Sequence, residues 1–347
     1  AKLVEQKAEQ DQDAKLVDQQ KQQQQKNEEP PEQSIVLLGD STLDNSYWVD
    51  DGEEVAALIA NNLPQMNVIN LAVDGFTTNS LLKGDWRDRA VKSKQHTHSY
   101  FNPFAELKKH INVEYIVLSV LGNDFREKLA TIVFTPEEQR ADLIANITKS
   151  IVSNYLEIIK QIRITKPDAK LIVLSQYTPD LNNDLYQIYF LMYLLNQKKT
   201  VSNELSAFLE FGCYEMLTSK TETNNAGVQK LQSIMAQVYQ PIFNELNKQS
   251  VAVIDLSSSF DYQDSTLYES QIEPSAKGGQ LISSLVTYVV KNHDFSKPAQ
   301  IYSQPLGQTA PTIMSKPLVL VKDNWVPQDH PEIQIHKKAK QQAAPQK

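Results

Sequence analysis

The sequence predicts an α/β fold in which a parallel sheet is covered by helices on both faces. Short apolar segments alternate along the chain with longer segments whose apolar residues recur at helical spacing. The short segments begin near Ile35, Val68, Tyr115, Leu171 and Val251, and their aliphatic character is typical of strands buried on both faces. Strands that alternate with helices in this way form parallel sheets.

The composition is that of a globular chain and limits the partners it can have. Apolar residues make up 41% and charged residues 22% of the 347 residues, which suits one large domain or two smaller ones. The 34 basic and 42 acidic residues give a net charge of -8, which disfavours nucleic acids and anionic membranes as partners. The chain has no run of about 18 apolar residues, so we expect no membrane span.

The single cysteine and the N-terminus bear on the cellular compartment. Cys213 alone excludes an internal disulfide and fits a reducing compartment. No signal peptide is visible at Ala1, although the missing initial Met leaves a processed N-terminus open. We expect a cytoplasmic protein, or a secreted one without a visible signal peptide.

The expected folded domain covers residues 34–294, between two arms. Residues 1–33 are polar and Gln-rich, so we expect a disordered or fraying helical arm, with a docking segment for a protein partner as the alternative. Residues 295–347 are rich in Pro and Gln and are expected to be mostly disordered. An insertion at about 185–225 contains the apolar run Ile188–Leu195, which predicts a packed helical hairpin or a lid over the site.

Helices are expected where apolar residues recur at helical spacing. They cover residues 52–63, 104–111, 136–164 and 275–292. Thr135 is the expected N-cap of the third helix, with Pro136 in its first turn and Glu138 closing a capping box. The polar residues 84–103 are expected to form a long loop.

The most informative segment is Ser34–Asn45, which reads S-I-V-L-L-G-D-S-T-L-D-N. Its aliphatic strand ends at Gly39, where glycine permits a sharp turn. Ser41 therefore follows the carboxyl end of a central strand, the edge at which open α/β sheets bind ligands. A serine there can act as a nucleophile if a base and oxyanion donors lie nearby. The alternative is a turn before a helix N-cap, since Asp and Ser both favour such positions.

Two further strands end at the same edge of the predicted sheet. Residues 74–78 follow the second strand and residues 121–124 follow the third. The backbone N–H groups of Gly75 and Ser41 and the side-chain amide of Asn123 can donate to an oxyanion. The order of these segments on successive strands is more specific than any one of them.

Together the three segments resemble those of the SGNH/GDSL hydrolase family. The matches are G-D-S-T-L-D-N around Ser41, L-A-V-D-G-F-T-T around Gly75 and V-L-G-N-D around Asn123, and the resemblance covers about Ile35 to Val290. It implies a three-layer α/β/α, flavodoxin-like fold, activity on esters, Ser41 as the nucleophile, and Gly75 with Asn123 as the oxyanion hole. Three acidic residues of these segments are the expected supporting residues: Asp40, Asp44 and Asp124.

The fourth block departs from the family pattern. The family carries Asp-x-x-His just before a proline and a terminal helix, whereas this chain reads I-E-P-S. Glu273 stands in place of the histidine and Ser270 in place of the aspartate, which predicts a subgroup with atypical acid–base residues. Glu273 is the candidate base, because burial would raise its pKa. The alternative is a carboxylate that caps the terminal helix beside Pro274.

Four histidines are candidates for the role of the histidine that the fourth block lacks. His96 and His98 lie in the expected polar loop, which could fold over the site. His110 and His293 are expected at the opposite edge of the sheet. The His-x-His pair has no apparent third ligand for a metal, so we expect neither a metal nor a cofactor.

The predicted function is that of a serine esterase or related acyl hydrolase acting on a small-molecule, lipid or glycan ester. A non-catalytic scaffold that binds a ligand or a protein is the first alternative, favoured by the loss of the Asp and His. Acyl transfer to an acceptor other than water is the second alternative.

Overall fold

The computed structural model describes residues 33–90, 96–179, 226–269, 272–304, 306, 313–317, 319–321 and 324–326. Its main sheet contains seven strands. They are β1 (Ser34–Gly39), β2 (Asn67–Asn70), β5 (Val113–Ser119), β6 (Lys170–Leu174), β7 (Ala252–Ile254), β10 (Gln300–Ser303) and β11 (Met314–Pro317). Their order is β11-β10-β7-β6-β5-β1-β2, and neighbouring strands are parallel except for β10 and β11.

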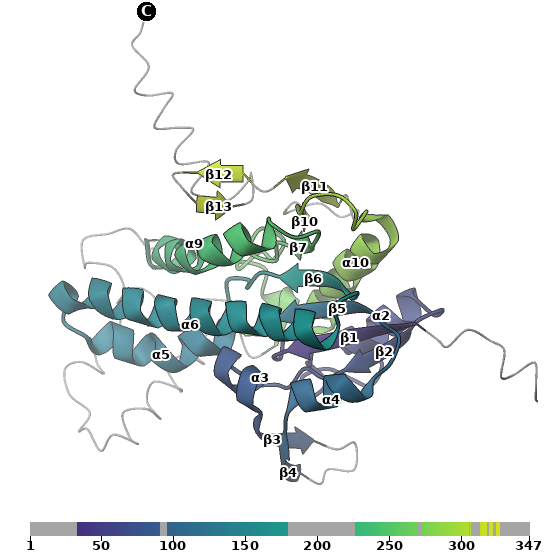
Figure 1. The fold of residues 1–347 in the computed structure, drawn as a ribbon. Coiled ribbons are helices and arrows are strands. Elements are labelled where there is room, and N and C mark those ends of the chain that lie inside the picture. Colours follow the sequence, from purple (N-terminus) through teal and green to yellow (C-terminus); the bar gives the residue numbers. More distant parts are fainter. Residues whose placement is uncertain are drawn as a thin grey trace, which may run out of the picture.

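Helices form a layer on each face of this sheet (Figure 1). They are α2 (Val55–Asn62), α3 (Thr78–Lys83), α4 (Pro103–Lys109), α5 (Gly122–Phe134), α6 (Glu137–Thr165), α9 (Ala226–Leu246) and α10 (Ala276–Asn292). Helices α2 and α10 pack against each other on one face, and the other helices cover the opposite face. The fold is therefore the expected three-layer α/β/α arrangement.

The central strand β1 explains why both faces must be covered. Its side chains alternate between two separate apolar clusters, with Ile35 and Leu37 in one and Val36 and Leu38 in the other. All four side chains are fully buried. A strand that is aliphatic on both sides loses contact with water only between two helical layers, and this burial supplies most of its stabilisation.

The predicted parallel strands are confirmed, and so is the last helix. The strands near Ile35, Val68, Tyr115, Leu171 and Val251 correspond to β1, β2, β5, β6 and β7. The last helix, α10, begins at its N-cap Ser275, whose Oγ accepts a hydrogen bond from the Gly278 N–H at 3.1 Å.

The prediction that Thr135 is the N-cap of the long helix is wrong. Helix α6 begins at Glu137, and Pro136 occupies the N-cap position without a side-chain hydrogen bond. Thr135 instead closes α5, where its hydroxyl donates to the Thr131 carbonyl at 2.8 Å. Because the Thr135 hydroxyl is bonded to the last turn of α5, it does not cap α6.

A hairpin replaces the long loop expected at residues 84–103. Strands β3 (Asp85–Ala90) and β4 (His96–Phe101) pair with each other and project from the end of α3 and α4 (Figure 1). Trp86 and Tyr100 lie opposite each other in the register, with their rings in edge contact at 6.2 Å. Such cross-strand aromatic pairs stabilise a hairpin even where the surrounding residues are polar.

The sheet also continues past residue 294, where the sequence predicts that the domain ends. Strand β10 pairs with β7 in parallel, and β11 returns antiparallel to β10. Ile301 and Tyr302 are 2% and 3% exposed, so this segment is part of the core. Expected disorder over residues 295–347 is wrong for these strands. The arm at 1–32 and the Ile188–Leu195 run lie outside the described residues.

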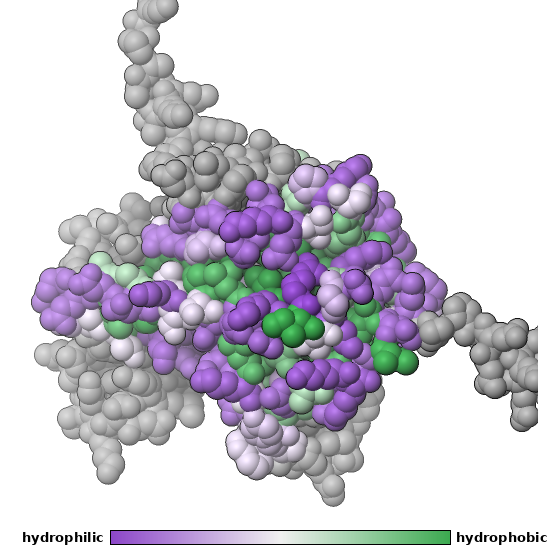
Figure 2. Space-filling model, in the orientation of Figure 1, coloured by the Kyte–Doolittle hydropathy of each residue, from purple (hydrophilic) through white to green (hydrophobic). Residues whose placement is uncertain are grey.

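Figure 2 shows the outer face of the layer that contains α4, α6 and α9. Hydrophilic side chains predominate on this face, as expected for helices whose apolar stripes pack on a sheet. Within the part of the chain that is described, no helix has the length and apolar character needed to cross a bilayer.

We expect Ile301→Ala to destabilise the domain, because it removes buried methyl groups from strand β10. The expected loss is about 2–4 kcal/mol in the free energy of unfolding. Urea unfolding followed by circular dichroism measures it. Leu306→Ala is the control, since Leu306 is 50% exposed, and it should change stability by no more than about 0.5 kcal/mol. Equal stability of both variants would contradict the placement of β10 in the core.

Candidate active site

The carboxyl ends of β1, β2 and β5 meet at one edge of the sheet. The backbone N–H of Asp40 donates to the Ser119 carbonyl at 2.9 Å, and the N–H of Val73 donates to the Gly39 carbonyl at 3.0 Å. These two bonds hold the segments that follow the three strands against one another. Ser41, only 8% exposed, lies in the first of them.

Gly39 makes this junction possible. Its φ of +143° lies in a region that L-residues rarely adopt, and a Cβ at this position would come within 1.6 Å of the Ser119 carbonyl oxygen. Only glycine therefore allows β1 to turn here while remaining hydrogen-bonded to β5. This requirement accounts for the glycine in the G-D-S segment.

The structure brings the side chains of Ser41 and Glu273 together. The Ser41 hydroxyl lies near enough to the Glu273 carboxyl to lower its pKa, so the two side chains are neighbours at this edge. Glu273 is 1% exposed, and its Oε2 atom has no hydrogen-bond partner within the described part of the chain. Burial raises the pKa of Glu273 to about 8, and the charge of Asp74 adds to this effect, whereas Ser41 and Arg126 oppose it. The capping role considered for Glu273 is filled by Ser275 instead.

Two long-range contacts hold the fourth block beside the first. The Asn45 side chain, fully buried, donates through Nδ2 to the Pro274 carbonyl at 3.1 Å and accepts from the Val55 N–H at 2.9 Å. The Tyr177 hydroxyl donates to the Ile272 carbonyl at 2.5 Å. The sequence analysis missed both residues, because nothing in the local pattern links Asn45 to a proline 229 positions away.

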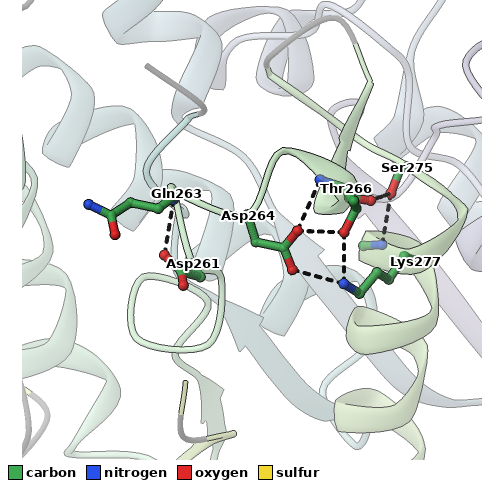
Figure 3. A network of polar contacts seen from close by, with 7 residues as sticks. Asp261, Gln263, Asp264, Thr266, Ser275 and Lys277 are labelled. Carbon is green, nitrogen blue, oxygen red and sulfur yellow. Dashed lines mark hydrogen bonds and ion pairs between the residues drawn. The ribbon is translucent and has the colours of Figure 1, made fainter. Parts of the chain in front are cut away.

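A polar network also fixes the start of α10, just after Glu273 (Figure 3). The Ser275 hydroxyl donates to the Thr266 carbonyl at 2.7 Å, within the 3-10 helix η1 (Ser265–Leu267). Lys277 Nζ contacts Asp264 Oδ2 at 2.8 Å and donates to the Thr266 hydroxyl at 2.7 Å. The short strands β8 (Tyr268–Glu269) and β9 (Glu273–Pro274) complete the connection, with Glu269 opposite Glu273.

The candidate oxyanion donors lie on the neighbouring segments. Asn123, 6% exposed, is the second residue of α5, and its Nδ2 donates to the Phe76 carbonyl at 3.0 Å. This bond orients the amide and uses one of its two N–H groups. Gly75 has a φ of +82° and open space where a Cβ would be. The Gly75 N–H lies near the Asp74 carboxyl and lowers its pKa slightly.

Asp124 binds the loop after β2 to the start of α5. Its carboxylate accepts from the Thr78 N–H at 2.8 Å and from the Thr78 hydroxyl at 2.6 Å. Burial raises the pKa of Asp124 to about 6, although these two bonds favour its ionised form. The preceding Leu121 has a φ of +141°, a strained conformation of the kind that is concentrated at functional sites.

The other two predicted supporting residues hold the turn that carries Ser41. Asp40 accepts from the Thr42 N–H at 3.1 Å, and burial raises its pKa to about 7. Asp44 accepts from the Asp74 N–H at 3.2 Å, while the Trp48 indole N–H donates to the Asp74 carboxylate at 3.0 Å. The sequence analysis did not single out Asp74 or Trp48, although an acid at the carboxyl end of a strand was a usable signal.

None of the histidines has a described side chain at this edge. His96 and His98 lie on β4, and the described part of the structure gives their backbone pairing with β3 alone. His293 contacts the Tyr302 hydroxyl at 2.7 Å and the ring of Phe295, which in turn packs on Tyr115 near the amino end of β5. His293 therefore lies at the opposite edge of the sheet, as predicted.

Comparison with known proteins gives the family. Residues 35–333 match the model of the GDSL-like lipase/acylhydrolase family. An extracellular lipase from Streptomyces rimosus is 13% identical with a TM-score of 0.41, covering 75% of this chain and 100% of its own. Phospholipase A1 from Streptomyces albidoflavus is 16% identical with a TM-score of 0.39, and the match covers 75% of this chain and 99% of the phospholipase. No curated protein sequence matches the chain.

A family two carbohydrate esterase from Clostridium thermocellum, in complex with cellohexaose, is 16% identical with a TM-score of 0.40, covering 76% of this chain and 65% of its own. Because these TM-scores lie below 0.5, the assignment rests on the family model, which matches well over half of the chain. The order of the segments around Ser41, Gly75 and Asn123 agrees with it. The chain belongs to the GDSL-like lipase/acylhydrolase family.

Proposed function

We propose that the protein is a carboxylic ester hydrolase in which Ser41 is the nucleophile and Glu273 is the general base. The observation that carries this proposal is the fully buried carboxyl group of Glu273 beside Ser41, whose hydroxyl is close enough to lower the pKa of that carboxyl. Burial gives that carboxylate a pKa of about 8, far closer to neutral pH than that of an ordinary Glu. A base is most effective when its pKa lies near the working pH.

In the acylation step, the Glu273 carboxylate accepts the hydroxyl proton of Ser41 while Oγ forms a bond to the acyl carbon. The carbonyl electron pair moves to oxygen, which becomes the oxyanion. As the tetrahedral intermediate collapses, the bond to the alcohol breaks, and the protonated Glu273 gives its proton to the departing alkoxide. The product is an acyl ester on Ser41.

In the second step, water takes the place of the alcohol. Glu273 accepts a proton from water as its oxygen adds to the acyl carbon, and the resulting intermediate releases Ser41, which regains its proton from Glu273. The atoms and charges balance without a cofactor. The same steps transfer the acyl group to another hydroxyl where an acceptor displaces water, so acyltransfer stays an alternative outcome.

Asn123 is the principal oxyanion donor in this proposal. Its amide is held by the Phe76 carbonyl and sits at the start of α5, where the helix dipole also favours negative charge. The N–H groups of Gly75 and Ser41 are the further donors in this proposal. Preorganised donors of this kind stabilise the transition state more than the bound ester.

A binding scaffold without catalysis is the second candidate function. The departure that favours it is the I-E-P-S segment, which lacks the family's aspartate and histidine. The retained Ser41, Gly75 and Asn123 favour the enzyme. Reaction of Ser41 with a fluorophosphonate, followed by intact mass, separates the two functions, because a scaffold without an activated serine is not labelled.

We expect Ser41→Ala to abolish hydrolysis of p-nitrophenyl acetate and labelling by the fluorophosphonate. Glu273→Gln should lower kcat/KM by about 10²–10⁴-fold, the usual contribution of a general base. Asn123→Ala should lower it by about 10²–10³-fold, as for one oxyanion donor. Each variant is first checked by circular dichroism and thermal unfolding, so that a loss of activity is not a loss of folding.

Glu269→Gln is the matched control for Glu273→Gln, because Glu269 is an exposed carboxylate on the paired strand β8. It should retain full activity. A neutral Glu273→Gln combined with inactive His96 or His98 variants would identify a loop histidine as the base. Absence of hydrolysis and of labelling in the wild type would leave the binding scaffold as the function.

The raised pKa of Glu273 predicts the pH dependence. Because the base must be ionised, kcat/KM should rise about tenfold per pH unit at lower pH and level off above the pKa of about 8. Stability should run the other way: the folded state binds more protons than the unfolded state between the ordinary value of 4.5 and about 8, so the free energy of unfolding falls as the pH rises through this range. Stopped assays and urea unfolding from pH 5 to 9 measure both. A flat rate profile would contradict Glu273 as the base.

A further inference from the structure

The peptide carbonyls on the two sides of Glu273 are both held by side chains from elsewhere in the chain. The Tyr177 hydroxyl, from a residue 95 positions earlier, donates to the Ile272 carbonyl at 2.5 Å. The Asn45 side chain donates through Nδ2 to the Pro274 carbonyl at 3.1 Å. The backbone that carries the candidate base is therefore fixed immediately before and immediately after this residue.

The Tyr177 ring is itself held in an aromatic cluster. It stacks on Phe260, with ring centroids 4.6 Å and planes 16° apart, and it makes an edge contact with Tyr268 at 5.8 Å. All three residues are buried. Because closely packed rings have few alternative rotamers, the hydroxyl that holds the Ile272 carbonyl has a fixed position.

Asn45 is fixed because its amide forms hydrogen bonds on two sides. Its Oδ1 accepts from the Val55 N–H at 2.9 Å, at the start of α2, while its Nδ2 donates to the Pro274 carbonyl. Asn45 is fully buried and lies four residues after Ser41. It therefore joins the segment of the nucleophile directly to the segment of the base.

The Glu273 side chain depends on this support from its backbone. Its Oε2 atom is buried and has no hydrogen-bond partner in the described part of the chain. In sites that pair a serine with a histidine, an acid holds the base in its orientation. The fourth block has no such acid in the expected place, where Ser270 stands.

We propose that Tyr177 and Asn45 are the positioning residues of the base, and that they clamp the two peptide groups around Glu273 so that its carboxyl lies beside Ser41. They thereby take the orienting role of the aspartate that the fourth block lacks. Both act on the reaction through Glu273. This inference rests on the proposed function, in which Glu273 is the base.

The surroundings of Tyr177 agree with this role. Burial raises the pKa of Tyr177 well above its usual value, and the charges of Glu273 and Asp40 add to this effect, so its hydroxyl lies near both carboxyl groups. A tyrosine hydroxyl in these surroundings stays protonated at every pH at which Glu273 titrates. The donor to the Ile272 carbonyl is therefore kept while the base gains and loses its proton.

The test is a double-mutant cycle on the full chain, measured as kcat/KM for p-nitrophenyl acetate and as the rate of Ser41 labelling by a fluorophosphonate. Tyr177→Phe removes the hydroxyl and keeps the stacked ring. It should lower both rates by about 10–10²-fold, because a small displacement of a catalytic group is costly. In the Glu273→Gln background the same change should lower them by less than about twofold, since the group that Tyr177 positions is already lost.

Tyr302→Phe is the matched control. Tyr302 is also buried, and its hydroxyl is hydrogen-bonded to His293 and Gln300 at the opposite edge of the sheet. This variant should lose a comparable amount of thermal stability, measured by circular dichroism, and keep the wild-type rates. A general loss of buried hydrogen bonding is thereby separated from the misplacement of the base.

Asn45→Asp tests the other half of the clamp. It keeps an oxygen that accepts from the Val55 N–H and removes the donor to the Pro274 carbonyl. Its rates should fall in the wild-type background and stay unchanged in the Glu273→Gln background, as for Tyr177→Phe.

Wild-type rates in Tyr177→Phe would overturn the clamp. An equal loss in the wild-type and Glu273→Gln backgrounds would also overturn it, because it would show a structural role alone. If Tyr177→Phe does not fold, the cycle with Asn45→Asp decides the question by the same criteria. Failure of the proposed function is distinct: the wild type is then not labelled, or Glu273→Gln keeps full activity, and the clamp falls with it because it has no base to position.

Discussion

The close approach of β1 and β5, where both strands leave the sheet, is the constraint on which the site depends. The Asp40 N–H reaches the Ser119 carbonyl only because Gly39 has no side chain at a point 1.6 Å from that oxygen. Because the two strands are joined there, Ser41, which follows β1, and Asn123, which follows β5, lie at the same edge of the sheet. A parallel sheet gathers such residues at one edge without any contact between them in the sequence.

Burial then determines the chemistry of this edge. Asp40, Asp124 and Glu273 all have raised pKa values, and in each case the main cause is loss of water around the carboxyl group. Hydrogen bonds from Thr42 and Thr78 offset part of this for the first two, whereas the Oε2 atom of Glu273 has no hydrogen-bond partner among the described residues. In the proposed mechanism, Glu273 with its raised pKa is the base, in a block that lacks the histidine of the family pattern.

Elements with strong patterns were predictable and weakly patterned ones were not. The aliphatic strands and α10, with its Ser275 cap, are plain in the sequence because burial and capping require particular residue types. Strand β10 and the β3–β4 hairpin were missed. They are short or polar segments that are recognisable only with their partners. Strand β10 pairs with β7, and β3 pairs with β4, where Trp86 lies opposite Tyr100. The fold class did not depend on them.

The sequence by itself determined the five parallel strands and the position of Ser41 after a tight glycine turn, since each depends on residue types within a few positions, and it made Asn123 and Glu273 candidates. Only the tertiary structure decided which groups surround Ser41. Asn45 reaches a carbonyl 229 residues away, and the Trp48 indole binds the Asp74 carboxylate from another turn. Such neighbours cannot be predicted from local sequence, because packing between distant segments sets both the burial of Glu273 and the charges that act on it.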